Sequence, residues 1–203
     1  MKDPWLLLGL TGAGLYVAKL WWGDRQAAKR GAPAAGAFPG ATEASGKAIG
    51  IAVAGALAIV ALETAGERAL GLDAEQSTMT WLFAAYAVLA APVIEELIFR
   101  GWLVVERHGR AVMWAGALGA SAVFAALHPF LWRWEDAGFE LTLTAKGWFS
   151  TAAVLAASLW FYAARLGPWN PTRSLLPCFA AHAAKNLGVV AVKAATGFMG
   201  GLW

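Results

Sequence analysis

The chain has 203 residues, of which 59% are hydrophobic and only 14% are charged, and its mean hydropathy is +0.55. Soluble domains are about 45–50% apolar and about 25% charged, so this composition excludes a water-soluble globule. The net charge of +3 comes from short clusters between long apolar runs, which suits anionic lipid headgroups and requires no nucleic-acid partner, and the single cysteine excludes an intramolecular disulfide.

Six apolar stretches are long enough to cross a bilayer, which takes about 20 helical residues. We therefore predict an all-α polytopic membrane protein with about six transmembrane helices, near residues 4–22, 47–65, 79–106, 111–131, 148–166 and 174–195. The first stretch starts like a signal peptide, but its length and the closing Trp21-Trp22 pair predict a retained anchor.

The chain divides into three predicted regions. Residues 1–78 hold two spans joined by a polar linker at 23–46, residues 79–195 hold the other four spans, and residues 196–203 form a short tail. Seven Lys and Arg lie in the loops on the linker's side of the membrane and five lie on the opposite side. By this small margin, the positive-inside rule predicts that both termini lie outside the cytoplasm.

The third span keeps three charged residues, Glu95, Glu96 and Arg100. A charge at the centre of a span costs about 2.5–3.5 kcal/mol, so a span that keeps several indicates function. Glu96 and Arg100 are four residues apart, and a structural ion pair is the simpler interpretation for them. Glu95 points about 100° away around the helix and has no local partner, so its carboxyl group suits proton transfer near neutral pH.

Two later spans each carry a histidine with a mate four residues away. Phe124 and His128 share one helical face, and Pro129 predicts that this helix kinks or ends at His128. His182 and Asn186 share a face of the last span. Taken alone, the first histidine fits a core residue, and the second pair fits an interhelical hydrogen bond.

Together, these groups can meet in one buried volume. On ideal helices, Glu95 lies about 16 Å and His182 about 12 Å from the membrane side that holds the loop between the third and fourth spans. His128 lies about 25 Å from that side, so a tilt of its helix or the kink at Pro129 must bring it to the depth of the other two. Two chemistries are open. Glu95 can take a proton from water that attacks a carbonyl, or Glu95, His128 and His182 can bind a metal ion that supplies hydroxide.

The three motifs resemble those of the CPBP (Abi) family in order and spacing: Glu95-Glu96-x-x-x-Arg100, Phe124-x-x-x-His128 and His182-x-x-x-Asn186. This family includes CAAX prenyl endopeptidases similar to Ras-converting enzyme, and bacteriocin-processing and immunity membrane proteins. The resemblance covers about residues 79–195 and implies a helical intramembrane glutamic protease that needs neither a cofactor nor a metal ion.

The resemblance also implies a role for each motif residue. Four residues would act on the substrate: Glu95 and His128 by activating water, and His182 and Asn186 by holding the oxyanion. Three would support the site: Glu96, Arg100 and Phe124.

The expected partners are the lipid bilayer and a peptide or membrane-protein substrate, and the expected location is a cell membrane, the inner membrane of a prokaryote. A prenylated substrate is not required, because relatives include enzymes paired with C-terminal sorting signals. Two alternatives from another class remain. One is a non-catalytic immunity or interaction protein, and the other is a proton-coupled carrier that uses Glu95, against which the lack of paired broken helices counts.

Overall fold

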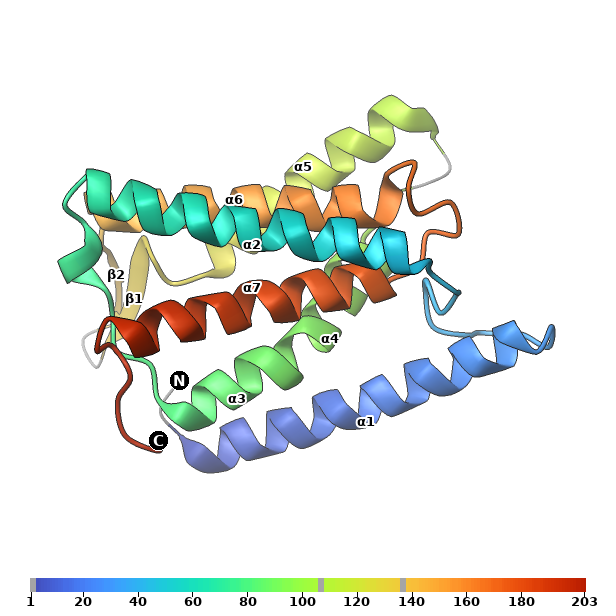
Figure 1. The fold of residues 1–203 in the computed structure, drawn as a ribbon, viewed down its shortest axis with the longest axis horizontal. Helices are drawn as coiled ribbons and strands as arrows, with labels where there is room; N and C mark the ends of the chain where they lie inside the picture. Colours follow the sequence, from blue (N-terminus) through green and yellow to red (C-terminus); the bar gives the residue numbers. More distant parts are fainter. Residues whose placement is uncertain (1–2, 106–107, 136–137) are drawn as a thin grey trace.

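The computed structural model describes residues 3–105, 108–135 and 138–203. Figure 1 shows long helices packed side by side in an elongated bundle, with both ends of the chain at the same end of the bundle. We call this the termini end. The long helices are α1 (Pro4–Lys29), α2 (Gly46–Ala69), α5 (Gly109–Leu127), α6 (Ala145–Leu166) and α7 (Leu176–Ala195).

Shorter elements connect the long helices. They are the 3₁₀ turn η1 (Asp73–Glu75), the helices α3 (Trp81–Leu89) and α4 (Ala91–Glu96), the π-helix η2 (Leu97–Trp102), and the strands β1 (Trp132–Glu135) and β2 (Gly138–Leu141). The two strands pair as an antiparallel hairpin at the termini end (Figure 1). The predicted all-α class is confirmed, and the hairpin is an addition that the sequence did not predict.

Polar side chains mark the starts of four helices. The side chains of Asp3, Ser45, Thr80 and Thr144 accept hydrogen bonds from backbone amides in the first turns of α1, α2, α3 and α6. Such caps satisfy amides that have no partner inside the helix. Because α1 runs on to Lys29, it extends into the predicted linker at 23–46.

Four segments are long and apolar enough to span a membrane, which is fewer than the six predicted: Gly46–Ala69, Trp81–Trp102, Gly109–Leu127 and Ala145–Leu166. The count of six is therefore corrected to four for the described residues. Helices α1 and α7 are long but less apolar, because α7 carries His182 and Lys185 and α1 ends in a charged turn. Both helices still pack within the bundle (Figure 1).

The predicted span at 79–106 is not one continuous helix. It breaks at Ala90 before Pro92, which has no amide hydrogen to donate, and it continues after Glu96 as the π-helix η2. Helix α1 packs closely against the break at Gly14, which has no side chain. A Cβ atom at this position would lie only 2.6 Å from the Ala90 Cβ. Within a bilayer, such irregular backbone is tolerated only where other groups satisfy it.

Small residues bring the helices close together. Where α2 and α6 cross, a Cβ atom at Gly55 would lie 2.1 Å from Cζ2 of Trp160. The Trp160 indole nitrogen donates to the Ala52 carbonyl at 2.8 Å. Only a glycine at position 55 lets this ring lie flat against α2.

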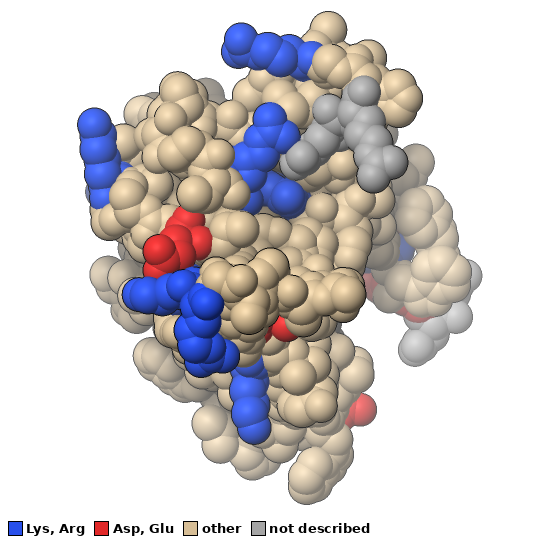
Figure 2. All heavy atoms as spheres, turned by 90° about the vertical axis from the view of Figure 1, so that its right-hand side faces the viewer, with Lys and Arg blue, Asp and Glu red and all other residues tan. Residues whose placement is uncertain are grey.

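The surface is arranged as in a membrane protein. Exposed tryptophans lie near both ends of the bundle: Trp5, Trp81, Trp148 and Trp203 at the termini end, and Trp22, Trp102 and Trp114 at the other. Such belts are typical of membrane interfaces. Figure 2 looks onto the end opposite the termini, where basic side chains outnumber acidic ones. Its exposed basic residues are Lys29, Arg30, Lys47, Arg110 and Arg173. The predicted orientation, with this end in the cytoplasm, stays a prediction.

Candidate active site

A cavity of about 580 Å³ runs along one face of α7 toward the termini end. Helix α7 contributes side chains at helical spacing to the lining: His182, Lys185, Asn186, Val189, Val192 and Lys193. The other walls come from α2, α3, α4, α6 and the segment that follows α5. Glu95, His128, His182 and Asn186 all line this cavity, so the structure brings together the four residues that were expected to act on substrate.

Glu96 and Arg100 form a fully buried ion pair behind the cavity. Nη1 of Arg100 donates to Oε1 of Glu96 at 3.1 Å, and both side chains have zero exposure. Nη2 of Arg100 donates to the backbone carbonyl of Ser158 at 2.9 Å and also to its hydroxyl. These bonds tie α4 and η2 to α6, which fits the expected supporting role of the pair.

Aromatic rings surround the Arg100 guanidinium. Its central carbon lies 4.7 Å from the ring centre of Phe124, 4.9 Å from that of Tyr162 and 5.3 Å from that of Phe161. Ring faces attract cations, most strongly where water is excluded. Phe124 also contacts the imidazole of His128, with ring centres 4.7 Å apart. It therefore packs between the ion pair and the cavity.

His182 joins the two glutamates. Its Nδ1 lies 2.8 Å from Oε1 of Glu96, and its Nε2 lies 3.8 Å from Oε2 of Glu95. A carboxylate only accepts hydrogen bonds, so the Nδ1–H donates to Glu96. Oε2 of Glu95 is buried and has no hydrogen-bond partner among the described residues. At 3.8 Å the Glu95 carboxylate lies beside His182 without a hydrogen bond to it, so it can accept one from a molecule in the cavity.

His128 reaches the cavity from the chain that follows α5. The helix ends at Leu127, and His128 has an extended conformation, with φ −77° and ψ 127°, as Pro129 predicted. The inclination of α5 in the bundle (Figure 1) and this turn bring the imidazole to the depth that ideal helices did not allow. Its Nδ1 lies 2.8 Å from the Phe124 carbonyl, which can only accept. The Nδ1 atom therefore carries the hydrogen, and Nε2 is left for water or substrate.

Asn186 is attached to the break between α3 and α4. Its Nδ2 donates to the Ala87 carbonyl at 2.7 Å. An amide nitrogen carries two hydrogens, so one remains for a ligand in the cavity. The structure thus adds an interhelical contact to the oxyanion-binding role that the resemblance implied for Asn186.

Several charged residues of the cavity were missed at the sequence level. Glu63 and Glu67 lie one turn apart on α2, inside or next to a predicted span, and this spacing was the available signal. The Lys146 ammonium bonds Glu67, whose other oxygen accepts from Gln76 at 2.9 Å. These contacts close the cavity wall between α2 and α6. Residues 1–78 thus contribute to the cavity, although they carry no recognised motif.

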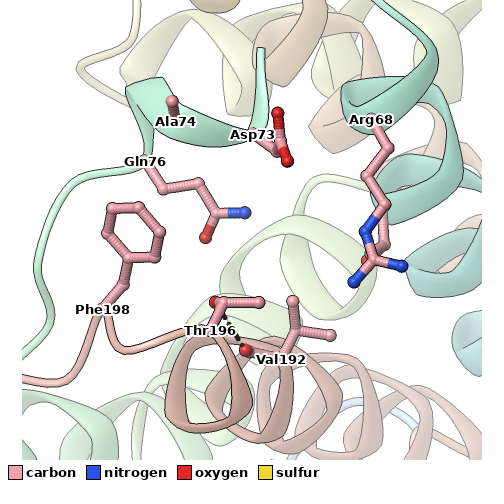
Figure 3. Close-up of a pocket in the computed structure, with 8 residues that line it drawn as sticks. Arg68, Asp73, Ala74, Gln76, Val192, Thr196 and Phe198 are labelled. Atoms are coloured by element: carbon pink, nitrogen blue, oxygen red, sulfur yellow. Dashed lines mark hydrogen bonds between the residues drawn. The ribbon is translucent and has the colours of Figure 1, made fainter. Parts of the chain in front are cut away.

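A smaller pocket of about 190 Å³ lies next to the cavity and shares Thr64, Gln76 and Val192 with it. Figure 3 shows its walls, which come from the end of α2, from η1 and from the end of α7. Arg68 and Asp73 supply its charges. The described part of this pocket contains no histidine, cysteine or paired carboxylates, so the groups suited to acid–base chemistry lie in the larger cavity.

The alternative metal site would join Glu95, His128 and His182. Among residues 3–105, 108–135 and 138–203, no three or more His, Cys, Asp or Glu side chains are grouped so that they could hold a metal ion.

The family of the chain follows from a match to a known family model. A family model described as type II CAAX prenyl endopeptidase Rce1-like matches residues 77–188, which is more than half of the chain. The chain belongs to the Rce1-like family. This is a family of proteases, and all seven motif residues of this Rce1-like protein fall within the matched segment. With the apolar helices, membership supports a multi-pass membrane protein. Comparisons with curated proteins and with solved structures found no match.

Replacing Glu96 with Gln tests the buried ion pair. The change leaves Arg100 fully buried without its charge partner, which typically costs about 3–5 kcal/mol. We expect a lower unfolding temperature in detergent and weaker expression, at least as evident as any loss of activity. Glu75→Gln, an exposed change at the cavity margin, is the matched control. If Glu96→Gln and Arg100→Ala are both as stable as the wild type, the pair does not support the site.

Proposed function

We propose that this chain is an intramembrane endopeptidase that cuts a peptide bond in a membrane-associated tail, using water activated by Glu95 and His128. One observation supports the proposal most strongly. Glu95 has a buried oxygen without a hydrogen-bond partner in the described part of the chain, and it lines the same cavity as His128, whose Nε2 is left available. A carboxylate and an imidazole that face one volume are suited to general acid–base catalysis.

The proposed reaction starts with a water molecule between Glu95 and His128. One water proton passes to the Glu95 carboxylate while the water oxygen bonds to the carbonyl carbon of the substrate. The former carbonyl oxygen becomes negative and accepts hydrogen bonds from Asn186 and from the Nε2–H of His182, which acts here as the imidazolium because its Nδ1–H is donated to Glu96. The proton then passes from Glu95 to the amide nitrogen, the carbon–nitrogen bond breaks, and a carboxylic acid and an amine leave.

The other motif residues position this machinery. Glu96 orients His182 through the Nδ1 bond, and Arg100 holds Glu96 in place. Phe124 fixes His128 through its carbonyl and its ring. Each group that touches the substrate is thus held by a neighbour, as precise transition-state geometry requires.

Glu95→Gln is the direct test of the proposed base. The amide keeps the size of the side chain but cannot take the water proton, so we expect turnover to fall about 10²- to 10⁴-fold while folding is preserved. The assay follows cleavage of a farnesylated peptide that ends in a CAAX sequence.

In parallel, the membrane proteomes of cells with wild-type and Glu95→Gln protein are compared for a peptide tail that persists only in the mutant. Cleavage at the wild-type rate would rule out Glu95 as the base.

The metal alternative predicts a different outcome. A metal held by Glu95, His128 and His182 would be removed by a chelator, and activity would be lost with it. Under the glutamic mechanism, we expect purified protein to keep its activity in excess chelator and to contain no stoichiometric zinc. Elemental analysis that finds one zinc per chain, with loss of activity on chelation, would favour the hydroxide mechanism.

Asn186→Ala tests the oxyanion site. Loss of one oxyanion donor typically lowers turnover about 10²- to 10³-fold, with little change in substrate affinity. We expect this pattern in kcat and KM. Since Asn186 also bonds Ala87, the unfolding temperature is measured on the same variant. A loss of stability or affinity with unchanged turnover would make Asn186 a structural contact or a substrate clamp.

A further inference from the structure

Lys185 is a buried cation that the proposed reaction does not use. It lies on α7 one turn after His182, its exposure is 8%, and it lines the cavity. Its Nζ is 3.8 Å from Oε2 of Glu63, which is too far for a hydrogen bond. Oε2 of Glu63 has no hydrogen-bond partner among the described residues. The Lys185 ammonium thus has Glu63 as an ion-pair partner without a hydrogen bond between them.

The other lysines that line the cavity have partners. The Lys146 ammonium bonds Glu67, and Nζ of Lys193 donates to the Ser77 carbonyl at 2.6 Å. A lysine ammonium has three hydrogens to donate, and burying it without acceptors is costly. Lys185 is therefore the cavity lysine whose hydrogen-bonding capacity is left for a ligand that supplies acceptor oxygens.

The surroundings of Lys185 favour an anion with a single charge. Glu63 and Glu95 line the same cavity and would repel a doubly charged group such as a phosphate monoester more strongly than a group with one charge. A carboxylate can accept from Lys185 while Glu63 remains beside the ammonium. The proposed cleavage acts on peptides, and each peptide chain ends in one carboxylate.

We propose that Lys185 binds the C-terminal carboxylate of the substrate and so directs cleavage to a bond near the end of the chain. This inference rests on the proposed protease function. Lys185 lies three residues after His182 and directly before Asn186 on α7, so its Cα is about 4.5 Å along the helix axis from that of His182 and its side chain leaves the helix close to both oxyanion donors.

The length of a CAAX tail fits this distance. Three residues follow the cysteine in such a sequence. In an extended chain they span about 10 Å, so a bond cut beside the cysteine lies about that far from the carboxylate. The three-residue rise from His182 to Lys185 is about 4.5 Å, and the four-carbon lysine side chain supplies the remaining reach.

The test compares two substrates that differ only at the terminus. The wild-type protein cleaves a farnesylated CAAX peptide with a free carboxylate, or the same peptide ending in an amide. Hydrogen bonds to charged groups correspond to about 10- to 100-fold in binding, so we expect the amide to raise KM by that factor with little change in kcat. In Lys185→Met the free acid should show the same rise in KM, and amidation should have no further effect.

Two variants serve as controls. Lys193→Met removes a cation from the same helix near the cavity mouth, and it should keep the full effect of amidation. Lys185→Arg keeps a cation at the site and should also keep part of that effect. If the wild type treats acid and amide alike, or if the amide effect persists in Lys185→Met, the inference is wrong even though Glu95-dependent cleavage stands.

Binding to the Glu95→Gln protein separates the two proposals. This variant retains Lys185 and the cavity, so the Kd values of the acid and amide peptides should differ about 10- to 100-fold whether or not turnover occurs. Equal Kd values for the acid and amide peptides would overturn the proposed role of Lys185. This result does not depend on the Lys185→Met variant, so it holds even if that variant fails to fold. Cleavage that does not depend on Glu95 overturns the proposed function instead.

Discussion

The buried pair of Glu96 and Arg100 is the interaction on which the rest of the site depends. Both side chains are fully buried inside an apolar bundle, where an unpaired charge would be very costly. The pair therefore requires further contacts, and it obtains them from Ser158 on α6, from surrounding rings and from His182 on α7. Satisfying one ion pair thus joins α4, η2, α6 and α7 into a single unit.

A break in the helix lies beside the site, and neighbouring side chains compensate for it. Irregular backbone leaves carbonyls without helical partners, which lipid cannot satisfy. Asn186 donates to Ala87 at the break, and the Tyr162 hydroxyl donates to the Phe99 carbonyl in η2 at 2.5 Å. π-Helical turns are frequent at functional sites. Here the irregular segment carries Glu95 and Glu96 just before the π-helix, with one carboxylate facing the cavity and the other facing the ion pair.

The cavity separates structural charges from available ones. Glu96 and Arg100 are paired with each other, and Glu67 is bonded by Lys146 and Gln76. Among the described residues, the Glu95 carboxylate and the Lys185 ammonium retain unused hydrogen-bonding capacity. A buried polar group without a partner is unfavourable unless a ligand or water completes it. This contrast points to the groups that meet the substrate, and it is visible only once all partners are placed.

The sequence by itself determined the helical membrane class, the end of α5 at His128 and the seven motif residues, because hydropathy, proline chemistry and helical spacing are local properties. The tertiary structure decided the rest. It joined Glu96 to His182 across 86 positions, brought His128 to the depth of Glu95, and added Glu63 and Lys185 from two helices to one cavity. It also divided the third span into α3, α4 and η2, and it left four segments of the described residues, instead of six, that are long and apolar enough to span a membrane. These outcomes depend on how helices tilt and cross, and spacing along one chain does not contain that information.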